Sequence, residues 1–593
     1  MSVLSYNSAS GLVRLLPFYF FLFLGIASAG DIYANGGQVC TVEQVLPKNR
    51  VPNAPVNSDI VIVYMSRKPN VCFDPTLIDN NGNTVPLRIL LHDEYESEKK
   101  NIFYGDITLR PLQNLHAGER YNIFFNGSKI SSFTTSRIRI DTRGHLVSIL
   151  PLSIVVPHIN RTSNFSRDEL NTLFMRIAFD VREIDLPIDS GPWRAIVTMG
   201  NAIGRETLRN LPVLARENFS GSALSLVMSL YFPHIIYPNS LYGVSFYYAV
   251  YRTIDPHGAP VSLSAVVIIP NGENIDYSNI PVFSYQHATI LNGVAQTEKS
   301  NLETIVGALI ASRGYVVVSS DGLGFGLTKN RVEPYLMQVA EASEYTDLIT
   351  AIRGYFENRH NISLKNVNYL MGISQGAHTS LAMARYMLSI DPSSVKDVYA
   401  ADGPYNLEKT FFSYASMVNS TDSKSNPYLY YIRSHQFFLP VFMRRYLRSV
   451  AAYNNMPANT FESAFYDIIG LLKKSFVQDL FEGKYGYVDA ALSLDTITNK
   501  LSSLKFIAPK SSMVVNLYHE ESDPIVSYQN TVDLFSKLKE NGFKLVNKGS
   551  CRKNSPFYKS VVSFVKAKAH PEWMHASCVP WFIEDIMKDI PSH

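Results

Sequence analysis

The sequence predicts an α/β protein with a mainly parallel sheet, preceded by a smaller β-sandwich. From about residue 240 onward, short apolar runs such as SLSAVVIIP, IPVFSYQH, GYVVVSSD and SSMVVNLYH alternate with helix-like stretches, a pattern typical of parallel sheets. Between about 38 and 137 the chain instead reads as short strands such as DIVIVYMS and GERYNIFFNG, with a turn signal at Asn81-Gly82. These two patterns indicate separate units with different architectures.

The amino-terminal segment has the pattern of a targeting signal. Arg14 is the only charged residue before Asp31, and the apolar segment LLPFYFFLFLGIASAG follows it. That segment is too short and too early for a spanning helix, and residues 27–29 fit a small-residue cleavage site. We expect a secretory signal over 1–29 and a secreted or periplasmic protein, with a single amino-terminal membrane anchor as the alternative. No cysteine stands at the cleavage site, which argues against a lipoprotein anchor.

The cysteines fall into two distant couples. An oxidising compartment lets all 4 pair, and 4 cysteines allow three connectivities. Pairing Cys40 with Cys72 and Cys551 with Cys578 would link no two separate domains. We therefore expect the disulfides Cys40–Cys72 and Cys551–Cys578.

Charge and composition exclude some functions. A net charge of +3 on 593 residues is nearly neutral, and no basic run resembles a nucleic-acid footprint. The glycine run SSDGLGFGLTKN opens no helix, so we reject a dinucleotide site. No His/Cys/Asp cluster has metal-ligand spacing, and we expect neither metal nor cofactor.

Strand-helix alternation also sets the expected domain boundaries. It stops between Gly403 and about Leu504, where helix-like stretches such as LPVFMRRYLRSVAAY take over, so we expect an insertion that covers the carboxyl ends of the strands. The predicted units are a signal over 1–29, a β-sandwich over 30–137, linker and packing helices over 138–239, and an α/β domain over 240–593 with the insertion at about 404–500.

The segment NYLMGISQGAHTSLAMARYML places a serine between a strand and a helix. Gly372 and Gly376 flank Ser374 at the spacing that a nucleophile on a sharp strand-to-helix turn needs, because its neighbours must lack side chains. At the amino end of the following helix, the Gln375 N–H can donate to an oxyanion. The alternative is an ordinary Gly-Ser loop.

A serine nucleophile needs a histidine base and a carboxylate, in the chain order Ser, Asp, His for this sheet topology. Asp523, in VVNLYHEESDPIVSYQN, follows an apolar strand and precedes a helix, which makes it the expected acid. Its competitors are Glu520 and Glu521, which we interpret as solvated, and Asp402, which we interpret as a loop-capping residue.

For the base, the segment AKAHPEWMHASCVPWFIEDIM offers His570 and His575. We favour His575, which directly precedes small residues and a closing amphipathic helix. The remaining candidates His519, His378 and His287 are better explained as neighbours of the loops or of the oxyanion region.

Five segments in order resemble the secreted α/β-hydrolases related to secretory lipases and bacterial esterases: SYQHAT, ASRGYVVVSSDGLGFGLT, EPYLMQVAEASEYTDLITAIRGYF, GISQGAHTSLAMARY and ESDPIV. The resemblance covers roughly 240–593 and implies an α/β-hydrolase fold with a helical lid, in which Ser374, Asp523 and His575 cleave small-molecule or lipid carboxylic esters. The second oxyanion donor would be Ala288 or Thr289, where relatives carry His-Gly.

The amino-terminal unit carries a resemblance of its own. The phrase ITLRPLQNLHAGERYNIFF resembles bacterial Ig-like modules, which typically act as spacers or weak adhesive units. Two other functions stay open for the whole chain: a serine peptidase of the same fold, and an inactive hydrolase domain that binds or adheres.

The predicted lid contains a dense apolar stretch followed by arginines. Phe437, Phe438, Leu439, Phe442 and Met443 precede Arg444, Arg445 and Arg448. We expect Phe438 and Phe442 to bind the acyl part of the substrate, and the arginine heads to lie in water or against an anionic lipid surface. The alternative is that the apolar residues only pack the lid onto the sheet.

Overall fold

The structure is a computed structural model of the chain. It describes residues 32–34, 38–98, 101–138, 142–152, 164–170, 241–273, 275–290, 297, 302–359, 362–419, 425–434, 439–466, 471–550, 574–575 and 578–591. The predicted signal over 1–29, His570, Phe437, Phe438 and Cys551 lie outside these residues. No helix within the described ranges is long and apolar enough to cross a membrane.

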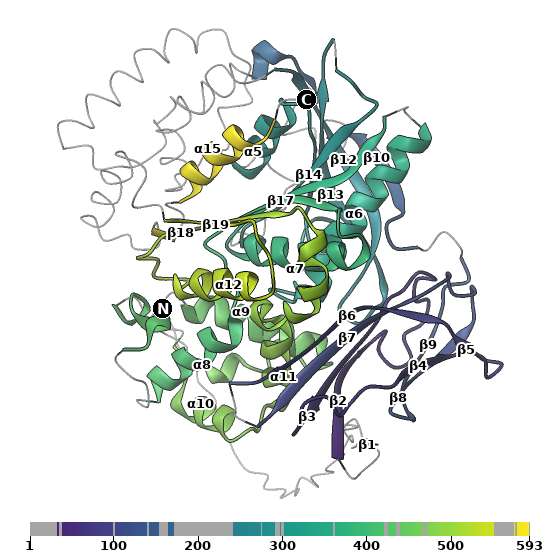
Figure 1. Cartoon of the computed structure of the whole chain (residues 1–593), viewed down its shortest axis with the longest axis vertical. Coiled ribbons are helices and arrows are strands. Elements are labelled where there is room, and N and C mark those ends of the chain that lie inside the picture. Colours follow the sequence, from purple (N-terminus) through teal and green to yellow (C-terminus); the bar gives the residue numbers. More distant parts are fainter. Residues whose placement is uncertain are drawn as a thin grey trace, which may run out of the picture.

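A mixed α/β sheet with helices forms the larger unit, which confirms the predicted class (Figure 1). The sheet has 10 strands in the order β10-β12-β13-β15-β14-β16-β17-β18-β19, with β11 paired to β12. The five pairings from β14–β15 to β18–β19 are parallel, whereas the β12–β13 hairpin and the β13–β15 pair are antiparallel. The strand bounds are Leu146–Pro151, Asn164–Phe165, Gly243–Ile254, Pro260–Asn271, Ile280–Gln286, Val316–Ser320, Leu364–Ile373, Val395–Ala401, Val514–His519 and Val546–Ser550 for β10 to β19.

Helices cover both faces of this sheet. Buried apolar residues form one cluster that includes α6 (Gln338–Arg359), α7 (Gln375–Ile390) and α12 (Gln529–Glu540). A second cluster includes α5 (Leu302–Ala311) and α15 (Val579–Asp589). Strand β14 is buried along its whole length because side chains on both of its faces meet these layers. Its apolar run in the sequence follows from that burial.

The segment between 138 and 240 contributes to the sheet where the structure describes it. Strand β10 pairs antiparallel with β12, so this segment supplies an edge strand as well as a connection. A capping box is present in this segment: Ser166 N donates to Glu169 Oε2 at 2.8 Å, and Glu169 N donates to Ser166 Oγ at 3.3 Å.

The region after β17 forms a separate helical layer with its own apolar core. Its helices are α8 (Leu407–Val418), α9 (Leu439–Tyr453), α10 (Lys474–Phe481) and α11 (Gly486–Asp495). In the view of Figure 1 they gather below the central sheet, beside strands of the amino-terminal unit. These helices occupy the segment predicted as a lid and are called the lid below.

The amino-terminal unit consists of two antiparallel sheets. One has the order β1-β2-β3-β7-β6 and the other β5-β4-β8-β9. Residues from both sheets, among them Ile62, Ile107, Tyr121 and Phe133, form one apolar core. The strand bounds are Ile32–Ala34, Gln38–Leu46, Ile60–Ser66, Pro75–Ile78, Thr84–Val85, Leu87–Glu96, Phe103–Pro111, Arg120–Phe125 and Ser128–Thr134 for β1 to β9.

This unit is joined to the larger one by buried charges. Arg385 of α7 pairs with Asp93, and its Nη2 lies 3.2 Å from Asp106 Oδ2. Lys500, whose side chain is fully buried, places its ammonium 2.5 Å from Asp106 Oδ1. The lid takes part as well, since Ser97 Oγ donates to Glu408 Oε1 at 2.7 Å. These contacts pack the amino-terminal unit against the larger one.

Candidate functional site

Ser374 occupies a strained turn between β16 and α7. Its backbone has φ 55° and ψ −117°, in the positive-φ region that residues with a side chain rarely adopt. The flanking glycines are sterically required. A Cβ on Gly372 would lie 2.1 Å from the Gly376 carbonyl carbon, and one on Gly376 would lie 2.1 Å from Gln286 O. The Gly-x-Ser-x-Gly spacing therefore has the steric cause that the sequence suggests: neither glycine position has room for a side chain.

The predicted acid, Asp523 in the loop after β18, lies next to the predicted base, His575, which precedes α15. His575 Nδ1 lies 2.6 Å from Asp523 Oδ2. The other carboxylate oxygen accepts hydrogen bonds from Ile525 N at 2.8 Å and Val526 N at 3.0 Å. Burial raises the pKa of Asp523, but attraction to His575 and bonds from His575 and His519 outweigh it and hold the pKa below its usual range. Asp523 is therefore an anion next to the imidazole.

His519 supports this carboxylate from behind, a contact that sequence reasoning missed. It is fully buried, and its Nε2 lies 3.0 Å from Val526 O and 3.4 Å from Asp523 Oδ2. Its Nδ1 lies 2.7 Å from Thr531 Oγ1. The position of His519 at the end of β18, four residues before Asp523, is the only local signal for this role.

Asp402 caps the same loop, as predicted, because its Oδ1 accepts from Glu520 N at 2.9 Å. Burial and repulsion from Asp523 raise its pKa well above the usual range. Ligand atoms of Asp402, His519 and Asp523 lie within 4.8 Å of one another. This set does not fit a metal, because both His519 nitrogens and both Asp523 oxygens already have protein partners.

Ser374 shares an apolar cavity with residues next to Asp523. The cavity holds about 560 Å³ of empty space, open solvent at its mouth included. Ile525 and Val526 line it beside Ser374, so the nucleophile candidate and the loop of the acid face one space. Within the described part of the chain, no hydrogen bond joins Ser374 to His575; such bonds are often long before a substrate binds.

The lid supplies most of the remaining wall of this cavity. The lining includes residues of α8, α9 and α11, among them Leu407, Phe411, Leu439, Phe442, Met443, Tyr446 and Leu492. Phe442 therefore lines the same cavity as Ser374, whereas Phe438 is outside the described residues. Nearly all of these side chains are aliphatic or aromatic, so the cavity suits an apolar group.

The two predicted oxyanion donors lie on neighbouring segments. Gln375 is the first residue of α7, where a backbone N–H has no partner within the helix. A Cβ on Gly376 would approach Gln286 O at 2.1 Å and His287 O at 2.8 Å, so the end of β14 passes directly beside this turn. Ala288 and Thr289 follow in that loop. Ala288 O accepts from His287 Nδ1 at 2.8 Å.

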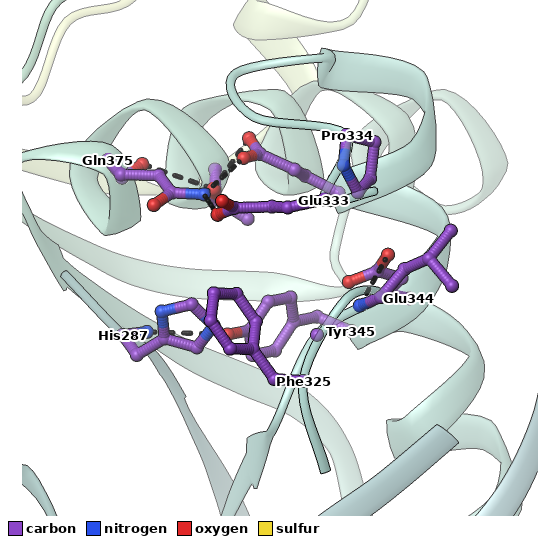
Figure 2. Close-up of a pocket in the computed structure, with 11 residues that line it drawn as sticks. His287, Phe325, Glu333, Pro334, Glu344, Tyr345 and Gln375 are labelled. Carbon is purple, nitrogen blue, oxygen red and sulfur yellow. Dashed lines mark hydrogen bonds between the residues drawn. The ribbon is translucent and has the colours of Figure 1, made fainter. Parts of the chain in front are cut away.

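Behind Gln375 lies a second, smaller and acidic cavity (Figure 2). Its lining includes His287, Glu333, Glu341, Glu344 and Gln375. The Gln375 Nε2 donates to Glu333 Oε1 at 3.0 Å and to Glu341 Oε1 at 2.8 Å, as the dashed lines show. Burial and repulsion from Glu341 raise the pKa of Glu344 well above the usual range. His378 also belongs to this network, with Nδ1 3.3 Å from Glu341 Oε2.

The disulfide prediction is confirmed where the structure describes both partners. Cys40 and Cys72 form a disulfide with a Cα–Cα distance of 6.0 Å. Cys578 takes part in a disulfide, and its predicted partner Cys551 lies outside the described residues.

Comparisons with known proteins give distant structural similarities. No protein-family model matches the chain, and no curated protein matches it. The rice cell wall degrading esterase LipA from Xanthomonas oryzae is 20% identical, with a TM-score of 0.44 over 62% of this chain and 94% of that one. A hydrolase from Legionella pneumophila described as putative is 15% identical, with a TM-score of 0.42 over 75% and 97%. Candida antarctica lipase A is 18% identical, with a TM-score of 0.34 over 52% and 71%. These values assign the chain to no family.

Proposed function

We propose that this protein is a secreted serine hydrolase that cleaves carboxylic esters through an acyl-enzyme intermediate. The observation that carries the proposal is the position of Ser374, strained at the head of α7 and open to an apolar cavity. The Asp523–His575 pair supports it from the neighbouring strand end. The Cys40–Cys72 disulfide supports secretion, because disulfides persist in oxidising compartments.

The proposed reaction follows from the orientation of the imidazole. Because Asp523 faces Nδ1, Nε2 is the nitrogen that takes the proton of Ser374 Oγ while this oxygen attacks the ester carbonyl. The Gln375 N–H and a donor from Ala288 or Thr289 stabilise the resulting oxyanion. His575 then gives its proton to the leaving alcohol, and water attacks the acyl-enzyme with His575 again acting as the base.

An ester substrate suits the cavity better than a peptide. Peptide recognition needs polar groups that bond the backbone of the substrate, whereas the wall beside Ser374 consists mostly of apolar residues, many of them from the lid. An acyl chain has no such polar groups and needs only an apolar wall. A peptidase is therefore the alternative outcome of the test.

The test is hydrolysis of a graded series of nitrophenyl esters and aminoacyl amides by the wild-type protein and Ser374→Ala. We expect ester cleavage, with kcat at least about a thousandfold lower in the variant. The matched control is Ser389→Ala near the other end of α7, which should leave kcat unchanged. A fluorophosphonate should label Ser374. Cleavage of amides alone would indicate a peptidase, and equal rates in Ser374→Ala would refute the nucleophile.

A further inference from the structure

Arg445 of the lid contacts the loop that carries one proposed oxyanion donor, and also Glu333, which binds the side chain of the other donor, Gln375. Its Nε and Nη2 both lie 2.5 Å from Glu333 Oε2. Its Nη1 donates to Ile290 O at 2.9 Å, two residues after Ala288. One guanidinium thus bridges the loop after β14 and the segment that precedes α6.

Glu333 also binds Gln375 and so links it to Arg445. Its second carboxylate oxygen, Oε1, accepts from Gln375 Nε2 at 3.0 Å, and Glu341 accepts from the same nitrogen. Gln375 is 4% exposed, and its amide nitrogen lies between the carboxylates of Glu333 and Glu341 (Figure 2). Because Gln375 opens α7, fixing its side chain also fixes the backbone N–H that faces the oxyanion.

Aromatic rings hold Arg445 in this position. Its guanidinium carbon lies 5.2 Å from the centroid of the Tyr335 ring and 5.8 Å from that of Phe325. The Tyr335 hydroxyl lies 3.0 Å from Thr289 Oγ1, in the loop of the second donor. A planar guanidinium can stack and bond in two directions at once, which an ammonium cannot.

We propose that Arg445 is a positioning residue that couples the lid to the oxyanion hole. When α9 packs in the position that the structure shows, Arg445 sets the spacing between the Gln375 N–H and the donor from Ala288 or Thr289. The lid then has two roles. It covers the acyl cavity, and its closure completes the oxyanion hole through Arg445. This inference rests on the proposed function, since it assumes that an oxyanion forms next to Ser374.

The matched pair of variants is Arg445→Met and Arg444→Met. Arg444 is the preceding residue of α9, but it pairs with Glu462 at 3.2 Å and stacks on Phe465 within the lid. Arg445→Met should lower kcat about 10- to 100-fold on a short nitrophenyl ester and leave KM within about threefold. Arg444→Met should change neither value by more than about twofold. Arg445→Lys, which keeps the charge and the fold, should recover only part of kcat.

A second readout separates positioning from packing. An alkyl boronic acid forms a tetrahedral adduct that places an oxygen in the oxyanion hole, whereas the corresponding alcohol only fills the cavity. Arg445→Met should weaken boronic acid binding by about the factor lost in kcat and leave alcohol binding unchanged. A raised KM and weaker alcohol binding at unchanged kcat would show that Arg445 only holds the lid closed, and overturn the proposal.

The route through Glu333 is tested by a double-mutant cycle. Glu333→Gln combined with Arg445→Met should be about as slow as Arg445→Met alone, because both changes break the same connection. Additive losses would overturn the route through Glu333. If Ser374→Ala keeps its esterase activity, the proposed function fails; if Ser374→Ala is inactive and Arg445→Met equals Arg444→Met, only the present inference fails.

Discussion

His575 Nδ1 lies 2.6 Å from Asp523 Oδ2, although 52 positions separate the two residues in the chain. The carboxylate is fully buried and the imidazole is 13% exposed, so the pair is largely shielded from water. Two backbone N–H groups hold the other Asp523 oxygen, and they fix its orientation independently of His575. Asp523 therefore sets which His575 nitrogen carries the proton in the resting protein.

Asp523→Asn should lower kcat/KM for a nitrophenyl ester about ten-thousandfold, because an amide no longer fixes the imidazole tautomer or stabilises the imidazolium. Steady-state kinetics on the folded variant measures this loss. Glu521→Gln, two residues earlier in the same loop, is the control and should stay close to wild type. A severe loss in Asp402→Asn with an active Asp523→Asn would identify Asp402 as the acid instead.

Phe442→Ala should change the chain-length preference. Phe442 lines the cavity next to Ser374, so its removal takes contacts from a longer acyl chain and leaves the shortest ester unaffected. The expected loss for the affected chain lengths is roughly 1–3 kcal/mol, tenfold to a few hundredfold in kcat/KM. Rates across a series of nitrophenyl esters measure it.

The control for Phe442 is its neighbour on α9. Val441 is 56% exposed and does not line the cavity, so Val441→Ala should keep the wild-type profile. A uniform loss over all chain lengths in Phe442→Ala, together with a lower Tm, would show that Phe442 only holds the lid together.

Asp106→Asn should destabilise the whole protein. Asp106 is 2% exposed and faces both Arg385 and Lys500, so its loss leaves buried cations short of a partner. We expect the free energy of unfolding to fall by about 3–5 kcal/mol, measured by denaturant titration of the full chain. The exposed Asp74 of the same unit provides the control Asp74→Asn, which should change little. Equal stability of the two variants would show that the interface charges contribute nothing.

Local sequence patterns predicted the strands and the turn whose structure depends mainly on residues nearby in the chain. The apolar runs before Ser374 and Asp523 correspond to β16 and β18, and the spacing of Gly372 and Gly376 reports a steric need of the turn itself. The pairing of His575 with Asp523 followed from chain order because the sheet topology brings those two loops together.

Contacts across long sequence separations could not be predicted in this way. Arg445 and Glu333 are 112 positions apart, and nothing in the lid's apolar pattern indicates which arginine faces inward. Likewise, Asp93 and Arg385 are 292 positions apart, and each resembles a surface charge in its own segment. The packing of whole units brings these groups together, and single-sequence periodicity carries no information about it.

Stability should depend on pH through Glu43, which lies on β2 near Asp489 of α11. Burial, with repulsion from Asp489, raises the pKa of Glu43 from 4.5 to about 7. The folded state therefore keeps a proton that the unfolded chain loses, so folding becomes less favourable as pH rises from about 4.5 to 7. Relative to Glu43→Gln, the wild-type free energy of unfolding should fall by about 2 kcal/mol between about pH 5 and 8. Denaturant titrations at several pH values measure it, with the exposed Glu273→Gln as the control; parallel pH profiles for the wild type and Glu43→Gln would contradict the prediction.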